Sequence, residues 1–341
     1  VEVSERIRAL VPCAEMVRFG KNGSDVTTAA VRAARAITGR DVILHSGYHG
    51  WHDWYLSENL GEEDGLDGHL LPGLDPAGVP RNLRGSVIPF NYNNLEELKE
   101  IISDHPDVGV VKMEVSRNMG PAEGYLEGVR ALCDEKNIVL IFDECTSGFR
   151  ETFGGLHKKY GVIPDMCMFG KALGNGYAIT AVAGKKSVMQ AAQKTFISST
   201  FWTERIGPSA ALATLAEMER LQSWEVITHT GQEIAKRWQQ LADSHNIEIN
   251  ILGLPALIGY SMPGDNWLEY KTFITQELLK KGILGGNSVY VCTEHKEEHL
   301  DRYFNELDSI YKIVADCKAG NQEITELLEG PVCHGGFKRL N

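Results

Sequence analysis

Five short runs of apolar and β-branched residues constrain the fold of this chain more than any other feature. They span residues 42–44, 108–113, 138–142, 166–169 and 179–183. Runs without polar alternation are typical of strands that are covered on both faces. Helix-like patterns separate most of these runs, notably at 94–103 and 126–136. This order predicts an α/β fold in which helices cover both faces of a largely parallel sheet.

The length and the later part of the chain predict two domains. At roughly 150 residues per domain, a chain of 341 residues forms about two. We expect a large domain over 1–205 and, over 206–341, a helix that leads into a smaller α+β domain. Helical patterns lie in this second part at 206–221, 228–244, 268–281 and 295–314, and strand-like pieces at 247–252 and 288–292.

Two further segments carry expectations about the chain as a whole. The stretch 61–80 is rich in Gly, Asp and Pro and predicts a long surface loop. The chain starts at Val1 without Met and soon reaches motif-rich sequence, which suggests that an N-terminal segment is absent.

Charge and cysteine content limit the partners and the compartment. The chain has 34 Lys and Arg against 46 Asp and Glu, a net charge of −12, which is the wrong sign for a protein that binds phosphate backbones. Its seven Cys are scattered and form no C-x-x-C pair, so they predict neither a disulfide framework nor a zinc ribbon. No run reaches the length of a membrane span, and no signal peptide is visible. We therefore expect a cytoplasmic protein that acts on small molecules, with no nucleic acid or membrane partner.

The sequence Asn22-Gly23-Ser24-Asp25 begins a predicted helix over 24–38 that ends before Gly39. Free N–H groups at a helix N-terminus, next to a small hydroxyl residue, form an anion site that suits a phosphate group. Ser24 is also a candidate N-cap, and a simple helix cap is the alternative interpretation.

Two carboxylates follow the apolar run 138–142, namely Asp143 and Glu144. In open α/β sheets this edge is where ligands bind. A buried acid there requires a cationic partner, such as a metal or a protonated ring nitrogen. The alternative is an ordinary capping Asp at the end of a strand.

A second run, 166–169, ends in Gly170-Lys171 and is followed by further glycines. A lysine at the end of a buried strand can be desolvated, which lowers the pKa of its amine and makes it a nucleophile for a Schiff base. The spacing does not match a nucleotide P-loop. A surface lysine in a turn remains the alternative.

Tyr48, within the segment 46–52, follows the run 42–44 and lies between two glycines. An aromatic ring at the end of a strand can stack on a planar cofactor. The three histidines His45, His49 and His52 are the alternative, as metal ligands, but no acid or Cys completes a recognisable spacing. We therefore expect no metal site.

Taken together, these motifs resemble the class III (subgroup II) pyridoxal-phosphate-dependent aminotransferases, close to the branch of glutamate-1-semialdehyde aminomutase. The matching segments are Asn22-Gly23-Ser24-Asp25, Tyr48-His49-Gly50, the run 143–150 from Asp143-Glu144 to Gly148-Phe149-Arg150, Pro164-Asp165 with Gly170-Lys171, and Ser199-Thr200-Phe201. The resemblance implies the aspartate aminotransferase-like fold of type I and the cofactor pyridoxal 5′-phosphate (PLP).

The resemblance also implies a role for each matched residue. Lys171 would carry the cofactor as a Schiff base and move the substrate proton, and Asp143 would pair with the ring nitrogen. Tyr48 would stack on the ring beside His49. The remaining cofactor-binding positions are Gly23 and Ser24 at the phosphate, Glu114 and Asn118 beside the 3′ oxygen of the ring, and Thr200 at the phosphate of the other subunit in a homodimer.

The leading interpretation is an aminotransferase that moves an amino group between a donor and an oxo acceptor through pyridoxamine phosphate. The alternative is an isomerase of the 2,1-aminomutase type. Two departures from that branch weaken the isomerase: Trp202-Thr203-Glu204-Arg205 after the Thr200 motif, and Asn287 before the segment 295–298. A non-catalytic scaffold is a third reading, against which the presence of Lys171 and Asp143 argues.

Overall fold

The computed structural model describes residues 1–61, 73–116 and 118–335. Most of the surface loop expected at 61–80 lies outside these residues. The chain forms two compact units, Val1–Leu221 and Gln222–Asn341. Helix α8 (Ile206–Leu221) belongs to the first of them.

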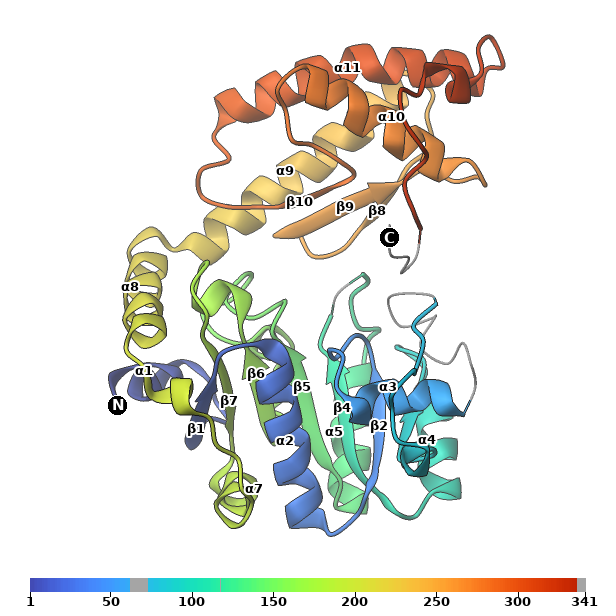
Figure 1. The fold of residues 1–341 in the computed structure, drawn as a ribbon. Helices are drawn as coiled ribbons and strands as arrows, with labels where there is room; N and C mark the ends of the chain where they lie inside the picture. The colour runs from blue at the N-terminus through green and yellow to red at the C-terminus, as the bar shows by residue number, and fades with distance from the viewer. Residues whose placement is uncertain (62–72, 117, 336–341) are drawn as a thin grey trace. The chain divides into compact units, whose positions relative to one another are not determined.

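The first unit contains a seven-stranded sheet with helices around it (Figure 1). Its strands are β1 (Met16–Gly20), β2 (Val42–Ser46), β3 (Val87–Pro89), β4 (Val108–Glu114), β5 (Val139–Glu144), β6 (Met166–Phe169) and β7 (Thr180–Gly184). Its other helices are α1 (Glu2–Leu10), α2 (Gly23–Thr38), α3 (Asp53–Leu56), α4 (Leu95–Asp104), α5 (Tyr125–Lys136), α6 (His157–Tyr160) and α7 (Lys186–Met189). Five 3₁₀ helices complete the described part of the unit: η1 (Ser57–Leu60), η2 (Arg81–Leu83), η3 (Lys171–Leu173), η4 (Gln190–Lys194) and η5 (Thr200–Thr203).

The strand order is β1-β7-β6-β5-β4-β2-β3. The strands from β6 to β3 are parallel to their neighbours, whereas β7 is antiparallel to both β6 and β1. The predicted, largely parallel sheet is therefore confirmed, and each of the five apolar runs forms a strand. Sequence analysis missed β1 and β3, because β1 is only half-buried with a central Arg18 and β3 has three residues.

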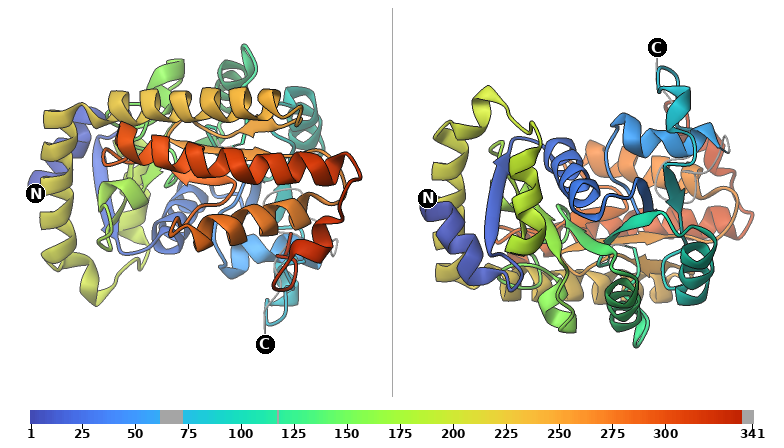
Figure 2. Two further views of the ribbon diagram at one scale, coloured as in Figure 1. Left: turned by 90° about the horizontal axis from the view of Figure 1, so that it is seen from above. Right: turned by 90° about the horizontal axis from the view of Figure 1, so that it is seen from below.

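Helices cover both faces of this sheet. Figure 2 shows α2 and α7 on one face and α4 and α5 on the other. Small residues along α2, such as Ala30 and Ala34, are fully buried and let the helix pack closely against β4 and β5. The cap of this helix differs from the prediction: Asn22, not Ser24, is the N-cap residue, and its side chain accepts a hydrogen bond from the Asp25 backbone N–H at 2.9 Å.

The second unit is a smaller α+β structure, as its sequence predicted. Its elements are α9 (Ser223–Ser244), β8 (Asn250–Leu252), β9 (Leu257–Ser261), α10 (Trp267–Lys280), β10 (Ser288–Tyr290), α11 (Glu297–Lys318) and the 3₁₀ helix η6 (Ile324–Leu327). The sheet is antiparallel with β9 in the centre. Sequence analysis missed β9, although its buried positions alternate.

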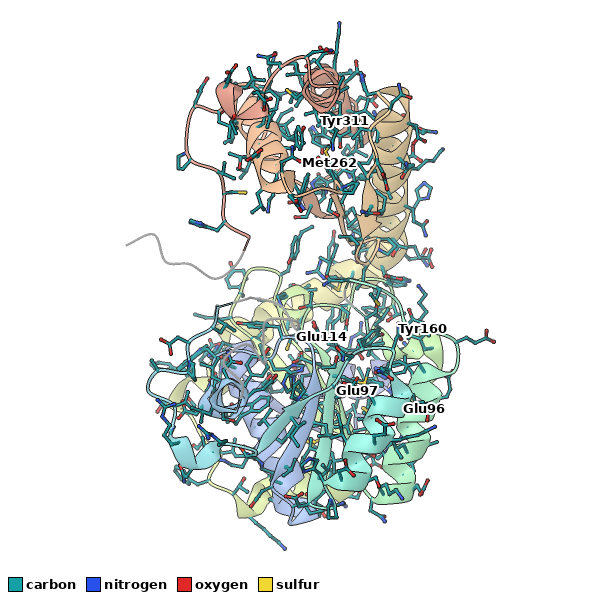
Figure 3. All side chains as sticks on the ribbon, turned by 90° about the vertical axis from the view of Figure 1, so that its right-hand side faces the viewer. Glu96, Glu97, Glu114, Tyr160, Met262 and Tyr311 are labelled. Carbon is teal, nitrogen blue, oxygen red and sulfur yellow. The ribbon has the colours of Figure 1, made fainter. Side chains whose placement is uncertain are left out.

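Aromatic side chains form much of the core of the second unit. Trp238 and Tyr260 are fully buried with ring centroids 4.8 Å apart, and the Trp238 indole N–H donates to the Tyr303 hydroxyl at 2.9 Å. Met262 and Tyr311, labelled in Figure 3, belong to the same core. No helix within the described ranges is long and apolar enough to cross a membrane.

Candidate active site

The candidate site lies at one edge of the large sheet. Strands β2, β4, β5 and β6 are parallel, so their carboxyl ends meet at the same edge (Figure 1). Four sequence-predicted residues end these strands or follow them directly: Tyr48 after β2, Glu114 on β4, Asp143 on β5 and Lys171 after β6. Glu114 is labelled in Figure 3. The strand register places Glu114 directly beside Asp143.

Close contacts of two glycines join the phosphate motif to the tyrosine motif. Gly50 has a φ of +103°, and a methyl group on it would lie 2.6 Å from the Ser24 Oγ. Gly47 has a φ of +102°, and a methyl group there would lie 2.6 Å from an oxygen of Glu114. Both positions favour glycine, since other residues are strained in this backbone region and an added carbon would force the Ser24 or Glu114 side chain to move. The turn after β2 therefore packs between the start of α2 and the end of β4.

Asp143 is buried and contacts two nitrogen-bearing side chains. Its Oδ2 lies 3.0 Å from the His49 Nδ1 and 2.5 Å from the Lys112 Nζ. The Lys112 Nζ also lies 2.6 Å from the His49 Nδ1. The side chains of Lys112 and His49 are both 0% exposed, and that of Asp143 is 8% exposed. Lys112 is therefore a cationic partner of Asp143 within the chain, and the predicted pairing of Asp143 with a protonated ring nitrogen stays a prediction.

The protonation states in this cluster follow from its geometry. The His49 Nε2 lies 3.2 Å from the Ser46 carbonyl oxygen, whereas its Nδ1 lies near both an acceptor, the Asp143 carboxylate, and a donor, the Lys112 ammonium. Burial together with the charge on Lys112 lowers the pKa of His49 to about 3, which keeps the ring neutral. Burial alone would raise the pKa of Asp143, but Lys112 and His49 hold it well below its usual range. The cluster therefore contains a carboxylate, an ammonium and a neutral imidazole.

Lys171 begins η3 with a φ of +39°, and its Nζ donates to the Thr146 Oγ1 at 2.8 Å. Strand β6 is completely buried, but Lys171 itself is exposed. The desolvation of the Lys171 amine stays a prediction, since Lys171 is the first exposed residue after the buried Gly170. The exposed amine remains open to a ligand from outside.

The Cys145 thiol lies where the start of α2 and the end of β6 approach each other. A methyl group on Gly23 would lie 3.9 Å from the Cys145 sulfur, and one on Gly170 would lie 3.7 Å from it. Burial raises the pKa of this thiol well above its ordinary value. Sequence analysis did not assign a role to Cys145, although it directly follows the Asp143-Glu144 motif.

The structure brings most of the predicted site residues together, but two lie outside these contacts. Asn118 and Thr200 are both exposed, the first in the segment after β4 and the second at the start of η5. Tyr48 is half-buried, with its ring 6.1 Å from that of Tyr55. Sequence analysis missed Lys112, whose signal is a single charged residue in the apolar run 108–113. Among the described residues, no group of three or more His, Cys, Asp or Glu could hold a metal ion.

Comparison with curated proteins gives two kinds of relatives. The chain is 34% identical over 309 residues to the 3-aminobutyryl-CoA aminotransferase of Cloacimonas acidaminovorans, which covers 87% of this chain and 70% of that protein. It is 30% identical over 332 residues to the glutamate-1-semialdehyde 2,1-aminomutase of Methanosphaera stadtmanae, with 90% and 77% covered.

Comparison with solved structures confirms the fold. The FumI protein of Sphingopyxis sp. MTA144, solved in its PLP internal aldimine form, superposes with a TM-score of 0.84 at 23% identity and covers 96% of this chain and 78% of that one. The family model for class-III aminotransferases matches residues 1–310. The chain belongs to the class-III aminotransferase family, and its α/β fold, its PLP cofactor and its transaminase class are those that the sequence motifs predicted.

Proposed function

We propose that this chain transfers an amino group between an amino donor and an oxo acceptor, with PLP bound to Lys171. The observation that carries the proposal is the exposed Lys171 amine at the edge where the start of α2 and the buried Asp143 meet. When bound, PLP supplies an electron-accepting ring that stabilises negative charge on the substrate carbon. The chain supplies the groups that hold the ring and move the proton.

The residues at this edge carry the chemical groups that the cofactor needs. The N-terminus of α2 offers N–H groups at Gly23 and Ser24 for a phosphate. Tyr48 offers an aromatic face, and Asp143, with its depressed pKa, offers a permanent carboxylate for a protonated ring nitrogen. Glu114 and Asn118 are proposed beside the 3′ oxygen of the ring.

Lys171 is proposed as the base that takes and returns the substrate proton. Its Nζ has a hydroxyl partner in Thr146, which gives the amine a fixed position after it leaves the cofactor. His49 would keep Asp143 oriented, because its ring is locked between the Ser46 carbonyl and the Lys112–Asp143 pair.

The aminomutase reaction is the second candidate, since glutamate-1-semialdehyde 2,1-aminomutases from several archaea are 29–30% identical to the chain. An aminomutase returns the nitrogen within one molecule and releases no oxo product. Incubating the PLP-loaded protein with an amino donor alone separates the two. An aminotransferase converts the bound cofactor and releases one equivalent of oxo acid, whereas an aminomutase leaves no oxo acid in solution.

Borohydride reduction followed by peptide mapping tests the lysine assignment. We expect the cofactor on Lys171 and no label in Lys171→Ala. The matched control is Lys185→Ala, which removes another lysine of the same unit that pairs with Asp165 at 2.7 Å. Label on Lys112 or Lys185 in the unaltered protein would show that the assignment is wrong.

We further propose a homodimer in which Thr200 completes the site of the partner. Large apolar side chains flank Thr200 and are strongly exposed in the single chain, with Phe196 at 90%, Phe201 at 70% and Ile206 at 69%. Exposed apolar side chains so close together are typical of an interface.

Mixing two inactive variants tests this arrangement. A mixed dimer of Lys171→Ala and Thr200→Ala has one site in which both residues are intact. Random exchange between equal amounts should therefore restore about a quarter of the sites. Mixed dimers without activity would refute a role of Thr200 across the interface, and an active monomer would refute the dimer.

Small-molecule partners and a cytoplasmic location complete the proposal. The net charge of −12 argues against a nucleic acid partner. All seven cysteines are free thiols, which is usual in a reducing compartment.

A further inference from the structure

We propose that Lys112 is a positioning residue that fixes the charge state of Asp143 and His49 and thereby lowers the proton affinity of the cofactor's ring nitrogen. This inference rests on the proposed role of Asp143 as the partner of that nitrogen. Neither the sequence motifs nor the similarity to known proteins assigns a role to Lys112.

The position of Lys112 in the sheet is the first observation. Val110 of β4 and Ile141 of β5 face the core beneath α2. Side chains alternate along a strand, so Lys112 and Asp143 lie on this same face. Lys112 is paired in register with Ile141, two residues before the pair of Glu114 and Asp143. A lysine on this face has no path to solvent, and its side chain is 0% exposed.

The hydrogen-bond donors in the cluster are the second observation. The Asp143 Oδ2 accepts hydrogen bonds, and the Lys112 Nζ lies 2.5 Å from it and 2.6 Å from the His49 Nδ1. An ammonium has three protons and can donate to more than one partner. Lys112 therefore contacts both groups and places a positive charge directly on the Asp143 carboxylate.

Other charged and titratable groups surround this cluster. His45 on β2 is fully buried against Glu58 of η1, and burial together with the charge on Lys112 lowers the pKa of His45 to about 3. Glu114 ends β4, and Cys145 follows β5. The Cys145 backbone N–H donates to the Asp143 Oδ1 at 3.2 Å, and Lys112 and His49 contact the Oδ2.

The positive charge of Lys112 affects how tightly a bound cofactor would hold the proton on its ring nitrogen. A protonated ring nitrogen held by Asp143 would share the carboxylate with the Lys112 ammonium, and two positive charges near one carboxylate would repel each other. The ring nitrogen should therefore hold its proton less tightly than it would beside Asp143 alone. Without Lys112, the pyridinium would become the main counter-charge of a buried carboxylate.

The test compares the full-length protein with Lys112→Met, loaded with PLP that carries ¹⁵N in its ring. We expect the ring nitrogen of the unaltered protein to lose its proton within the pH range in which the protein stays folded. In Lys112→Met this titration should move up by at least about one pH unit, a tenfold change in proton affinity. Lys185→Met is the matched control and should leave the titration unchanged, because Lys185 pairs with Asp165 instead.

A second readout separates positioning from packing. The rise in melting temperature on adding PLP should be larger in Lys112→Met than in the unaltered protein, because the cofactor then supplies the missing positive charge. If Lys112 only fills space, its replacement should lower the melting temperatures with and without PLP equally and leave the rise on adding PLP unchanged. Lys112→Gln, which is polar but neutral, should behave like Lys112→Met and replaces it if Lys112→Met does not fold.

Three outcomes would overturn the inference: a ring nitrogen in the unaltered protein that stays protonated at every pH, an unchanged titration in both Lys112 variants, or an unchanged rise in melting temperature. The first can be measured even if neither variant folds. Failure of the proposed function looks different, because PLP would then not be trapped on Lys171 by borohydride in the unaltered protein.

Discussion

Replacing Asp143 by Asn tests whether the buried carboxylate has a structural role as well as a chemical one. The change keeps the shape of the side chain and removes its charge, which leaves the fully buried Lys112 ammonium without an anionic partner at Oδ2. Breaking a buried ion pair in this way costs about 3–5 kcal/mol. With roughly 2–4 °C of melting temperature per kcal/mol in a domain of this size, we expect a fall of about 6–20 °C.

The double variant Lys112→Met/Asp143→Asn separates the two roles. It removes both charges together, so most of the lost stability should return. Transaminase activity should remain very low in both Asp143 variants, because an amide cannot keep the ring nitrogen protonated. The assay is a thermal melt of each protein without cofactor, beside its rate of oxo acid release.

The control is the exposed pair of Lys99 and Glu96, whose side chains are 47% and 77% exposed and 2.6 Å apart. Glu96→Gln should hardly change the melting temperature, because water screens an exposed pair. An Asp143→Asn protein that melts like the unaltered one, or a double variant that is less stable than the single one, would refute the reasoning about the buried pair.

Three further predictions follow from other parts of the structure. The pKa of Asp143 is depressed in the folded chain, so its contribution to stability is present above the usual aspartate pKa of about 3.9 and is lost as the pH falls below that value. Between about pH 5 and 3, the free energy of unfolding should therefore fall more steeply for the unaltered protein than for Lys112→Met/Asp143→Asn. The difference in slope should reach up to about 1.4 kcal/mol per pH unit. Gly50→Ala should weaken PLP binding in a fluorescence titration, since the added carbon meets the Ser24 Oγ at 2.6 Å; Gly78→Ala, with a φ of +87° and open space around it, should share the backbone strain but bind PLP normally. Gly231→Ala should destabilise the second unit by about 1–3 kcal/mol in denaturant unfolding, because the new carbon would lie 1.8 Å from the Pro255 carbonyl oxygen. The control Gly330→Ala adds a carbon that meets nothing within 4 Å, so it should leave the free energy of unfolding unchanged.

The sequence by itself determined the strands of the large sheet and the residues at their ends. The apolar runs at 138–142 and 166–169 form β5 and β6 because a strand covered on both faces must be apolar at every position. Asp143 is the second-last residue of β5, and Lys171 comes two residues after the end of β6, so both positions follow from where the apolar runs stop. Local patterns carry this information, and so the start and end of α2 could also be predicted to within about two residues.

Short or half-buried elements could not be predicted in this way. Strand β1 is half-buried at every position except Gly20, and β3 has only three residues, so neither gives a periodic signal. Both are strands because neighbouring strands offer them backbone hydrogen bonds. Their existence depends on the sheet and not on their own residues.

The charges around Asp143 were decided only by the tertiary structure. In the sequence, Lys112 is a single charged residue in an apolar run, 31 positions from Asp143. Its contact with Asp143 depends on the register of β4 against β5, which puts both residues on the same face of the sheet. The turn after β2 then brings His49 into contact with both. Pairing between strands joins residues that are far apart in the chain, and no local pattern records which residues will face each other across a sheet.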